Sequence, residues 1–178
     1  MDIAEIARML ETSSIGTWVR EGKSVAPMMS GLHILTVAFV FGTIFMVDLR
    51  LLGVSFTNRA FRLVSADMLR WTWIAFVLSA ISGVLLITAN ATIYLRNVPL
   101  QIKMVLIVLA GINMFVFERF TSRDVARWDA GHAPPAAKAA AAISLTLWIL
   151  VAVLGRWAGY TKGVVVPAVD PGVLGNFL

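Results

Sequence analysis

The sequence contains no cysteine, and only 14% of its 178 residues are charged. The missing cysteine excludes disulfide bonds, thiolate metal sites and covalent haem attachment through a Cys-x-x-Cys-His motif. Any metal or haem therefore has to be bound through His, Met, Lys or carboxylate side chains. The sequence also lacks a Ser/His/Asp set, a phosphate-cradling glycine loop and paired carboxylates within its apolar segments, so no pattern predicts a hydrolase or a nucleotide-driven enzyme.

Apolar residues are abundant and make up 59% of the chain. Soluble domains are about 45–50% apolar and about one-quarter charged, so this chain needs a bilayer as its solvent. Four apolar segments are long enough to cross one, since a spanning helix needs about 20 residues. We therefore predict an all-α fold, an integral membrane four-helix bundle that forms one domain over residues 25–160, with spans at 28–47, 71–95, 99–117 and 136–159.

Three further segments lie outside the predicted spans. Residues 1–24 carry apolar side chains at helical spacing among charges, which predicts an amphipathic helix on the membrane surface. Residues 54–69 are charged along one side and predict an amphipathic connector on the membrane face. Residues 161–178 are apolar but interrupted by Pro167 and Pro171, which predicts an irregular tail.

The net charge of +5 comes from Lys and Arg residues that flank the apolar segments and form no continuous stripe. This distribution predicts contact with anionic lipid headgroups and no nucleic-acid partner. When Lys103, inside a span, and Arg8, far from one, are left out, the basic residues favour the loops after the first and third spans. The positive-inside rule then places those loops in the cytoplasm and both termini in the periplasm.

Four polar residues within the spans lie at similar depth when the helices alternate in direction: His33, Asn90, Lys103 and Arg156. An ionisable group in the bilayer costs at least about 2.5–3.5 kcal/mol, so such groups usually face the bundle interior and mark a functional site. Arg156 is long enough to reach the headgroups, and we favour that position for it, whereas Lys103 fits either role. The His33 side chain is too short to do so. We predict a cofactor-binding site around these four residues.

Methionine suggests a metal alternative at the same place. Met29 lies four residues before His33, on the same helix face, and Met104 adjoins Lys103. Imidazole with thioether suits Cu(I), and His alone or His with Met suits haem iron. His132 belongs to the opposite membrane face, so a haem would need Met, Lys, water or a second subunit as its other ligand.

A second polar layer lies in the other leaflet. We interpret it as structural and expect its members to form ion pairs at the headgroups. They are Asp48, Arg50, Arg70, Glu118 and Arg119.

Several segments together resemble bacterial inner-membrane families of unknown function that have four transmembrane helices. The resemblance covers most of the chain and implies a multi-pass protein of the bacterial inner membrane. It rests on residues 31–42, 48–53, 103–113, 144–148 and 155–156.

A more distant resemblance rests on a His early in the first span and a Lys early in the third. These two residues are similar to those of the copper-resistance D membrane domain and of the HemJ-type protoporphyrinogen oxidase. In the oxidase family they are associated with haem and catalysis, which implies such roles for His33 and Lys103. The residues themselves assign no catalytic group.

Three functions follow as alternatives. The first is a small redox protein in which His33 ligates haem b or helps to bind a porphyrin or a quinone, with Lys103 and Arg156 pairing with anionic groups. The second is copper binding or transport through His33 and Met29. The third is non-catalytic: a membrane anchor or accessory subunit whose alanine-rich fourth span and surface helices dock a partner. The partner would be a second copy of the chain or another membrane or redox subunit.

Overall fold

The computed structural model describes residues 2–55, 57–121, 125–129 and 133–161, and every regular element in those ranges is a helix. Four of the helices are long and apolar enough to cross a membrane, each with an 18-residue window of mean hydropathy 2.0 or 2.1. This confirms the predicted all-α membrane bundle. They are α3 (Val25–Leu52), α4 (Phe61–Ala89), α6 (Val98–Val116) and α8 (Pro135–Tyr160).

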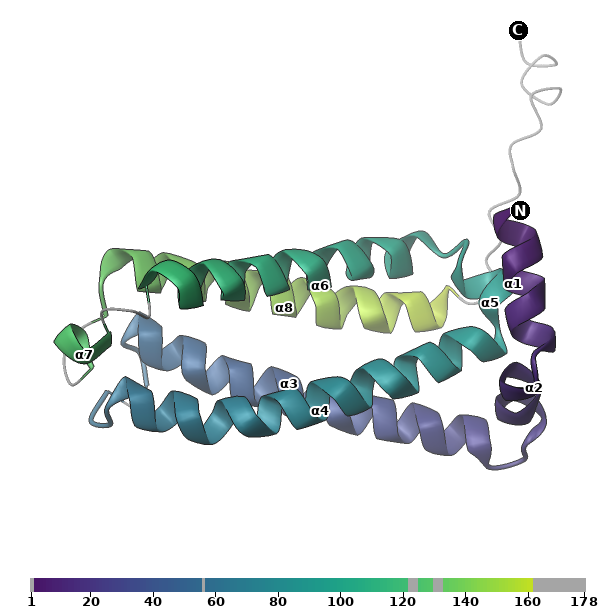
Figure 1. Cartoon of the computed structure of the whole chain (residues 1–178), viewed down its shortest axis with the longest axis horizontal. Coiled ribbons are helices and arrows are strands. Elements are labelled where there is room, and N and C mark those ends of the chain that lie inside the picture. Colours follow the sequence, from purple (N-terminus) through teal and green to yellow (C-terminus); the bar gives the residue numbers. More distant parts are fainter. Residues whose placement is uncertain (1, 56, 122–124, 130–132, 162–178) are drawn as a thin grey trace, which may run out of the picture.

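The spanning helices form two hairpins that lie side by side (Figure 1). Helix α3 packs on α4, α6 packs on α8, and the hairpins join mainly where α3 packs on α8. Over the described residues, α4 and α6 pack much less closely with each other than these pairs do. The outward faces carry large exposed apolar side chains, as a lipid-facing surface requires; examples are Leu35, Phe39, Ile81, Val108 and Phe115.

Local sequence signals set several helix ends. The Asn97 side chain accepts a hydrogen bond from the Leu100 amide, and proline follows in the first turn of α6. Helix α8 begins at Pro135, where the missing N–H would have had no partner in any case. Helix α3 ends at Leu52, and Gly53 follows it with a φ of 78°, the left-handed conformation that glycine adopts without strain.

The predicted surface helix is two helices, α1 (Ile3–Thr12) and α2 (Ser14–Glu21), which lie across one end of the bundle (Figure 1). The chain bends at Ser13, whose hydroxyl accepts from the Gly16 amide. Glu11 ties this layer to the bundle, because its Oε1 accepts from both the backbone amide and the hydroxyl of Thr92.

The predicted connector over residues 54–69 is wrong as a separate element. Helix α4 begins at Phe61 and continues without a break into the second span. It begins there because a distant loop caps its first turn. The Asp129 carboxylate accepts from the Arg62 amide at 2.8 Å, and the Asp129 carbonyl accepts from the Phe61 amide at 3.1 Å. The same span ends earlier than expected, at Ala89, and the short α5 (Ala91–Tyr94) follows.

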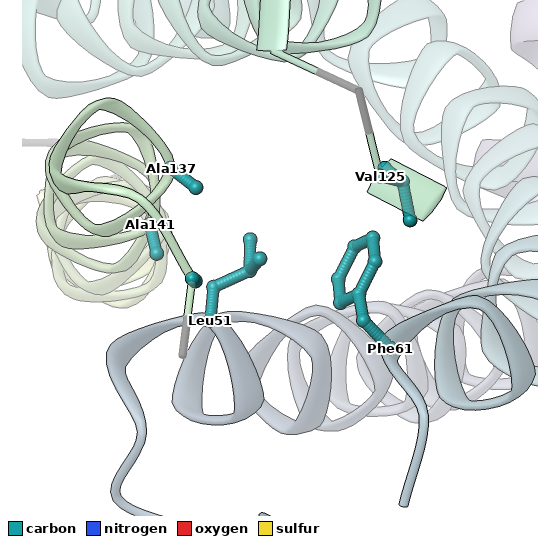
Figure 2. Close-up of a cluster of buried hydrophobic side chains, with 6 residues drawn as sticks. Leu51, Phe61, Val125, Ala137 and Ala141 are labelled. Atoms are coloured by element: carbon teal, nitrogen blue, oxygen red, sulfur yellow. The ribbon is translucent and has the colours of Figure 1, made fainter. Parts of the chain in front are cut away.

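The opposite end of the bundle carries a π-helical turn, Phe117–Thr121, and the short α7 (Val125–Trp128). Beneath them a small hydrophobic core joins α3, α4, α7 and α8 (Figure 2). The alanines of α8 in this cluster are almost fully buried, so the small residues at the start of the fourth span let helices of the same chain approach closely. The cluster consists of Leu51, Phe61, Val125, Ala133, Ala137 and Ala141.

Arg50 connects the loops at this end from inside the protein. Its side chain is 2% exposed, with Nε donating to the Arg59 carbonyl at 2.8 Å and Nη2 donating to the Asp129 carbonyl at 3.1 Å. A guanidinium satisfies both acceptors at once because its donors are held in a rigid plane.

Replacing Arg50 with lysine should therefore destabilise the fold. Arg50→Lys retains the charge but cannot reproduce the planar geometry, so at least one buried carbonyl loses its partner. We expect the free energy of unfolding to fall by about 2–4 kcal/mol. Denaturant titration of the purified protein measures this loss, and the exposed residue Arg70 provides the control: Arg70→Lys should change stability by less than about 0.5 kcal/mol. Equal effects of the two changes would contradict the role of Arg50.

Candidate functional site

His33 lies on α3, partly exposed, and its imidazole is anchored to α4. The ring Nδ1 is 2.9 Å from the Ser79 carbonyl oxygen and 3.1 Å from the Ser82 hydroxyl oxygen. A carbonyl oxygen can only accept, so Nδ1 carries the proton and donates it. The Ser82 hydroxyl already donates to the carbonyls of Leu78 and Ser79, and it therefore accepts from His33 as well.

This arrangement sets the chemistry of the other ring nitrogen. In a neutral imidazole only one nitrogen is protonated, so Nε2 keeps its lone pair. Histidines that ligate metals almost always donate their second ring N–H to a carbonyl, a carboxylate or water, as His33 does here. The Nε2 atom is thus prepared to act as a ligand or as a hydrogen-bond acceptor.

Two glycines make room for the polar side chains of the site. A Cβ on Gly83 would lie 3.0 Å from His33 Cε1, closer than nearly all real contacts of this kind. A Cβ on Gly155 would lie 3.2 Å from Lys103 Nζ. The ring of His33 therefore lies directly against α4, and the ammonium of Lys103 lies directly against α8.

Lys103 and His33 come from different hairpins, and Lys103 lies against α8, the helix through which its hairpin packs on α3. The alternation of helix direction predicts that the two side chains lie at similar depth. Such a pair would combine a base that has a free lone pair with a cationic donor within the apolar bundle.

The other two predicted site residues lie at or near helix ends. Asn90 directly follows α4, and its backbone carbonyl accepts from the amides of Ile93 and Tyr94. Arg156 is exposed, with its guanidinium carbon 4.6 Å from the centre of the Tyr160 ring. This position fits a side chain that extends toward the headgroups.

A protein family is matched over most of the chain. The model of a family of unknown function, DUF6644, matches residues 6–161. The chain belongs to this family. The match begins within α1 and includes α2 and all four spans of this DUF6644 protein, so the His33 site lies within the family domain. No curated protein and no solved structure matches the chain.

The methionines near the site differ in position. Met29 is partly buried one turn before His33, whereas Met104 is half exposed on the outer face of α6. Among the residues the structure describes, no group of three or more His, Asp or Glu side chains could hold a metal ion. His132, the other histidine, lies outside the described residues.

The second polar layer differs from its predicted role. Asp48 and Arg50 do not pair: the Ser144 hydroxyl donates to Asp48, and Arg50 donates to backbone carbonyls. Residues two positions apart on a helix do not face each other, which separates these two side chains. An ion pair joins Arg20 and Glu21, which lie outside this layer.

Sequence reasoning missed the residues of α4 that hold the imidazole. A signal for them exists, because Ser79, Ser82 and Gly83 are spaced three and four residues apart and share one helix face. That face is opposite His33 when the first two spans form a hairpin.

The hydrogen bond to Ser79 predicts the tautomer of His33. We expect the neutral ring to carry its proton on Nδ1, and ¹⁵N NMR of histidine-labelled protein in lipid nanodiscs measures this directly. The change His132→Gln leaves a single histidine and makes the assignment unambiguous. Ser82→Ala should preserve the tautomer, because the carbonyl acceptor remains. A proton found on Nε2 would show that the assigned geometry is wrong.

Replacing Gly83 with alanine should displace the imidazole. The added methyl group overpacks the contact with His33, so we expect a loss of about 1–3 kcal/mol in unfolding free energy and a shift of the His33 ring signals. Gly42→Ala is the matched control, since a Cβ on Gly42 meets no atom within 4 Å. That change should raise stability by about 0.4–1 kcal/mol by restricting the unfolded chain. Similar responses of both variants would rule out the close packing against His33.

Proposed function

We propose that this membrane protein binds a redox-active group through His33 and takes part in electron transfer, with haem b as the leading candidate. The observation that carries the proposal is the hydrogen bond from His33 Nδ1 to the Ser79 carbonyl. That bond fixes the ring orientation and leaves Nε2 unprotonated, the state required of an axial ligand. A bound haem would supply one-electron chemistry that the side chains of this protein lack.

Lys103 supports an anionic ligand at the same depth. A cation within the bundle is costly unless a negative group accompanies it, and a haem propionate is such a group. The close approach of Lys103 Nζ to Gly155 leaves the ammonium on α8, across from the α3–α4 hairpin that holds His33. Arg156, which follows Gly155 in the sequence, would provide a second cation closer to the membrane surface.

The route to His33 is from the lipid. His33 lines neither the cavity of about 300 Å³ near the α7 end nor the smaller one of about 150 Å³ beside α1. The imidazole is partly exposed, so a flat molecule dissolved in the bilayer can reach it. Water or a residue of a second copy of the chain would supply the other ligand of the haem iron.

A quinone is the second candidate, supported by the complementary character of the two side chains. The His33 Nε2 lone pair can accept from a quinol hydroxyl, while the Lys103 ammonium can donate to a carbonyl oxygen. The pair thus offers one acceptor and one donor at similar depth. Copper binding is supported only by the spacing of Met29 and His33 and is an outcome to test.

The visible spectrum of the full chain tests the leading candidate. After expression with added haem precursor, we expect a Soret band with one haem per chain, or one per two chains if a second copy supplies the other ligand. His33→Ala should abolish the band, and Lys103→Gln should weaken haem affinity by about tenfold through loss of a charged partner. His132→Ala should leave the spectrum unchanged.

Other results would select among the remaining candidates. A colourless wild-type protein after haem supply would refute haem binding, and chromatography of its extracted lipids would then show whether a quinone co-purifies. One copper per chain that is lost in both His33→Ala and Met29→Leu would establish the metal site instead. Co-purification of a stoichiometric partner subunit, together with unchanged properties of the His33→Ala variant, would favour the role of a membrane anchor or accessory subunit.

A further inference from the structure

A cavity of about 300 Å³ lies between the four spans, toward the end that carries α7. Asp48, which lines it, follows His33 by fifteen residues on α3, so Asp48 and His33 are separated by about 20 Å along the helix axis, and His33 is not among the lining residues. The volume is at the lower end of the range typical of small-molecule sites. Its walls are strongly aromatic, with Phe61, Trp73, Phe76, Phe117 and Trp148 contributed by or next to the four spans.

Asp48 is an incompletely satisfied carboxyl group in this cavity wall. The residue is 5% exposed, one contact is supplied by the Ser144 hydroxyl, and Oδ2 has no hydrogen-bond partner. A buried polar atom without a partner is costly, and native proteins rarely retain one. Rotation about the Cβ–Cγ bond of an aspartate is soft, so the side chain can turn an acceptor oxygen toward a molecule in the cavity.

The surroundings of Asp48 favour a positive ligand. Asp48 places an acid in the cavity wall, and the described residues that line the cavity include no Lys, Arg or His. Arg50 is the cation nearest in sequence, but it faces another direction and donates to the carbonyls of Arg59 and Asp129. Aromatic walls add to the effect, because ring faces attract cations.

Two loosely packed spans offer a route from the bilayer to the cavity. Residues of α4 and α6 both line it, and these are the neighbouring spans that pack least closely with each other in the described structure. A molecule that partitions into lipid would therefore meet the cavity along this edge.

We propose that this cavity binds a lipophilic organic cation, a protonated amine attached to an aromatic or alkyl body. The ammonium N–H would donate to the carboxylate of Asp48, and the aromatic side chains would enclose the apolar body. The site is separate from His33 and does not depend on the function proposed there.

Matched ligands test this proposal. N,N-dimethylbenzylamine is protonated at neutral pH and has one N–H, and isobutylbenzene is its neutral isostere. Equilibrium dialysis against nanodiscs containing the full chain, with empty nanodiscs as the blank, should give saturable binding of one ammonium per chain. Asp48→Asn should weaken ammonium binding by at least about tenfold, as expected for loss of a charge-assisted hydrogen bond, and isobutylbenzene binding by less than about twofold.

Two further variants separate charge from folding and shape. Glu21→Gln removes one acidic charge at the far end of the bundle and should leave binding unchanged. Gly111→Leu fills the cavity from α6, where a Cβ meets no atom within 4 Å, and should weaken both ligands without touching Asp48. Asn at position 48 can still bond to Ser144, so we expect the Asp48→Asn variant to keep a wild-type melting temperature.

Three outcomes would overturn the proposal. Unchanged ammonium binding by Asp48→Asn would show that the carboxyl group is not the counter-ion. Equal weakening of both ligands by that change would show a merely apolar cavity. Tighter binding of benzyl alcohol than of the ammonium would identify a site for neutral donors instead.

Discussion

Water is absent from the hydrocarbon core of a bilayer, so every polar group within this bundle has to find its partner in the protein. The helices meet that requirement through side chains that reach the backbone of a neighbouring span. His33 donates to the Ser79 carbonyl, and the side-chain amide of Asn113 donates to the Ala140 carbonyl at 3.0 Å. The Thr72 hydroxyl donates to that of Thr43 at 2.8 Å. Each bond joins two spans, so polar groups that are costly in lipid determine how the helices are arranged.

The same requirement distinguishes the two polar layers. In the layer nearer α1 and α2, hydrogen bonding of His33 is complete at Nδ1 and leaves Nε2 available. In the layer nearer α7, Arg50 donates to two backbone carbonyls, while Asp48 retains an oxygen without a hydrogen-bond partner. A free acceptor deep in an apolar bundle is where a ligand gains most from binding, and both layers present one.

Much of the fold could be predicted because length and apolarity alone define a membrane span. The amphipathic N-terminus was also predictable, although the bend at Ser13 was not, since it depends on one hydroxyl that accepts from the Gly16 amide. The start of α4 could not be predicted, because Asp129 caps it from a loop far along the chain. Spacing along one helix does not show which distant residue will lie beside it.

The candidate site, too, could be predicted only in part. Helix alternation predicts that His33 and Lys103 lie at one depth, but the partners of His33 on α4 depend on how two helices are rotated against each other. Ion pairs were expected within the layer that contains Asp48 and Arg50, but Arg50 donates to backbone carbonyls, which compete with carboxylates for a buried guanidinium. Burial and charge could be predicted from the sequence, but the choice of partner required coordinates.

The central claim is that His33 and Lys103 from separate hairpins lie together within the bilayer. The chain has no cysteine, so the pair His33→Cys with Lys103→Cys can be tested by a short bifunctional thiol reagent in native membranes. We predict efficient intramolecular cross-linking for this pair and little for His33→Cys with Met104→Cys, because Met104 is half exposed on the outer face of α6. Equal yields for the two pairs, or no cross-link to position 103, would contradict the account.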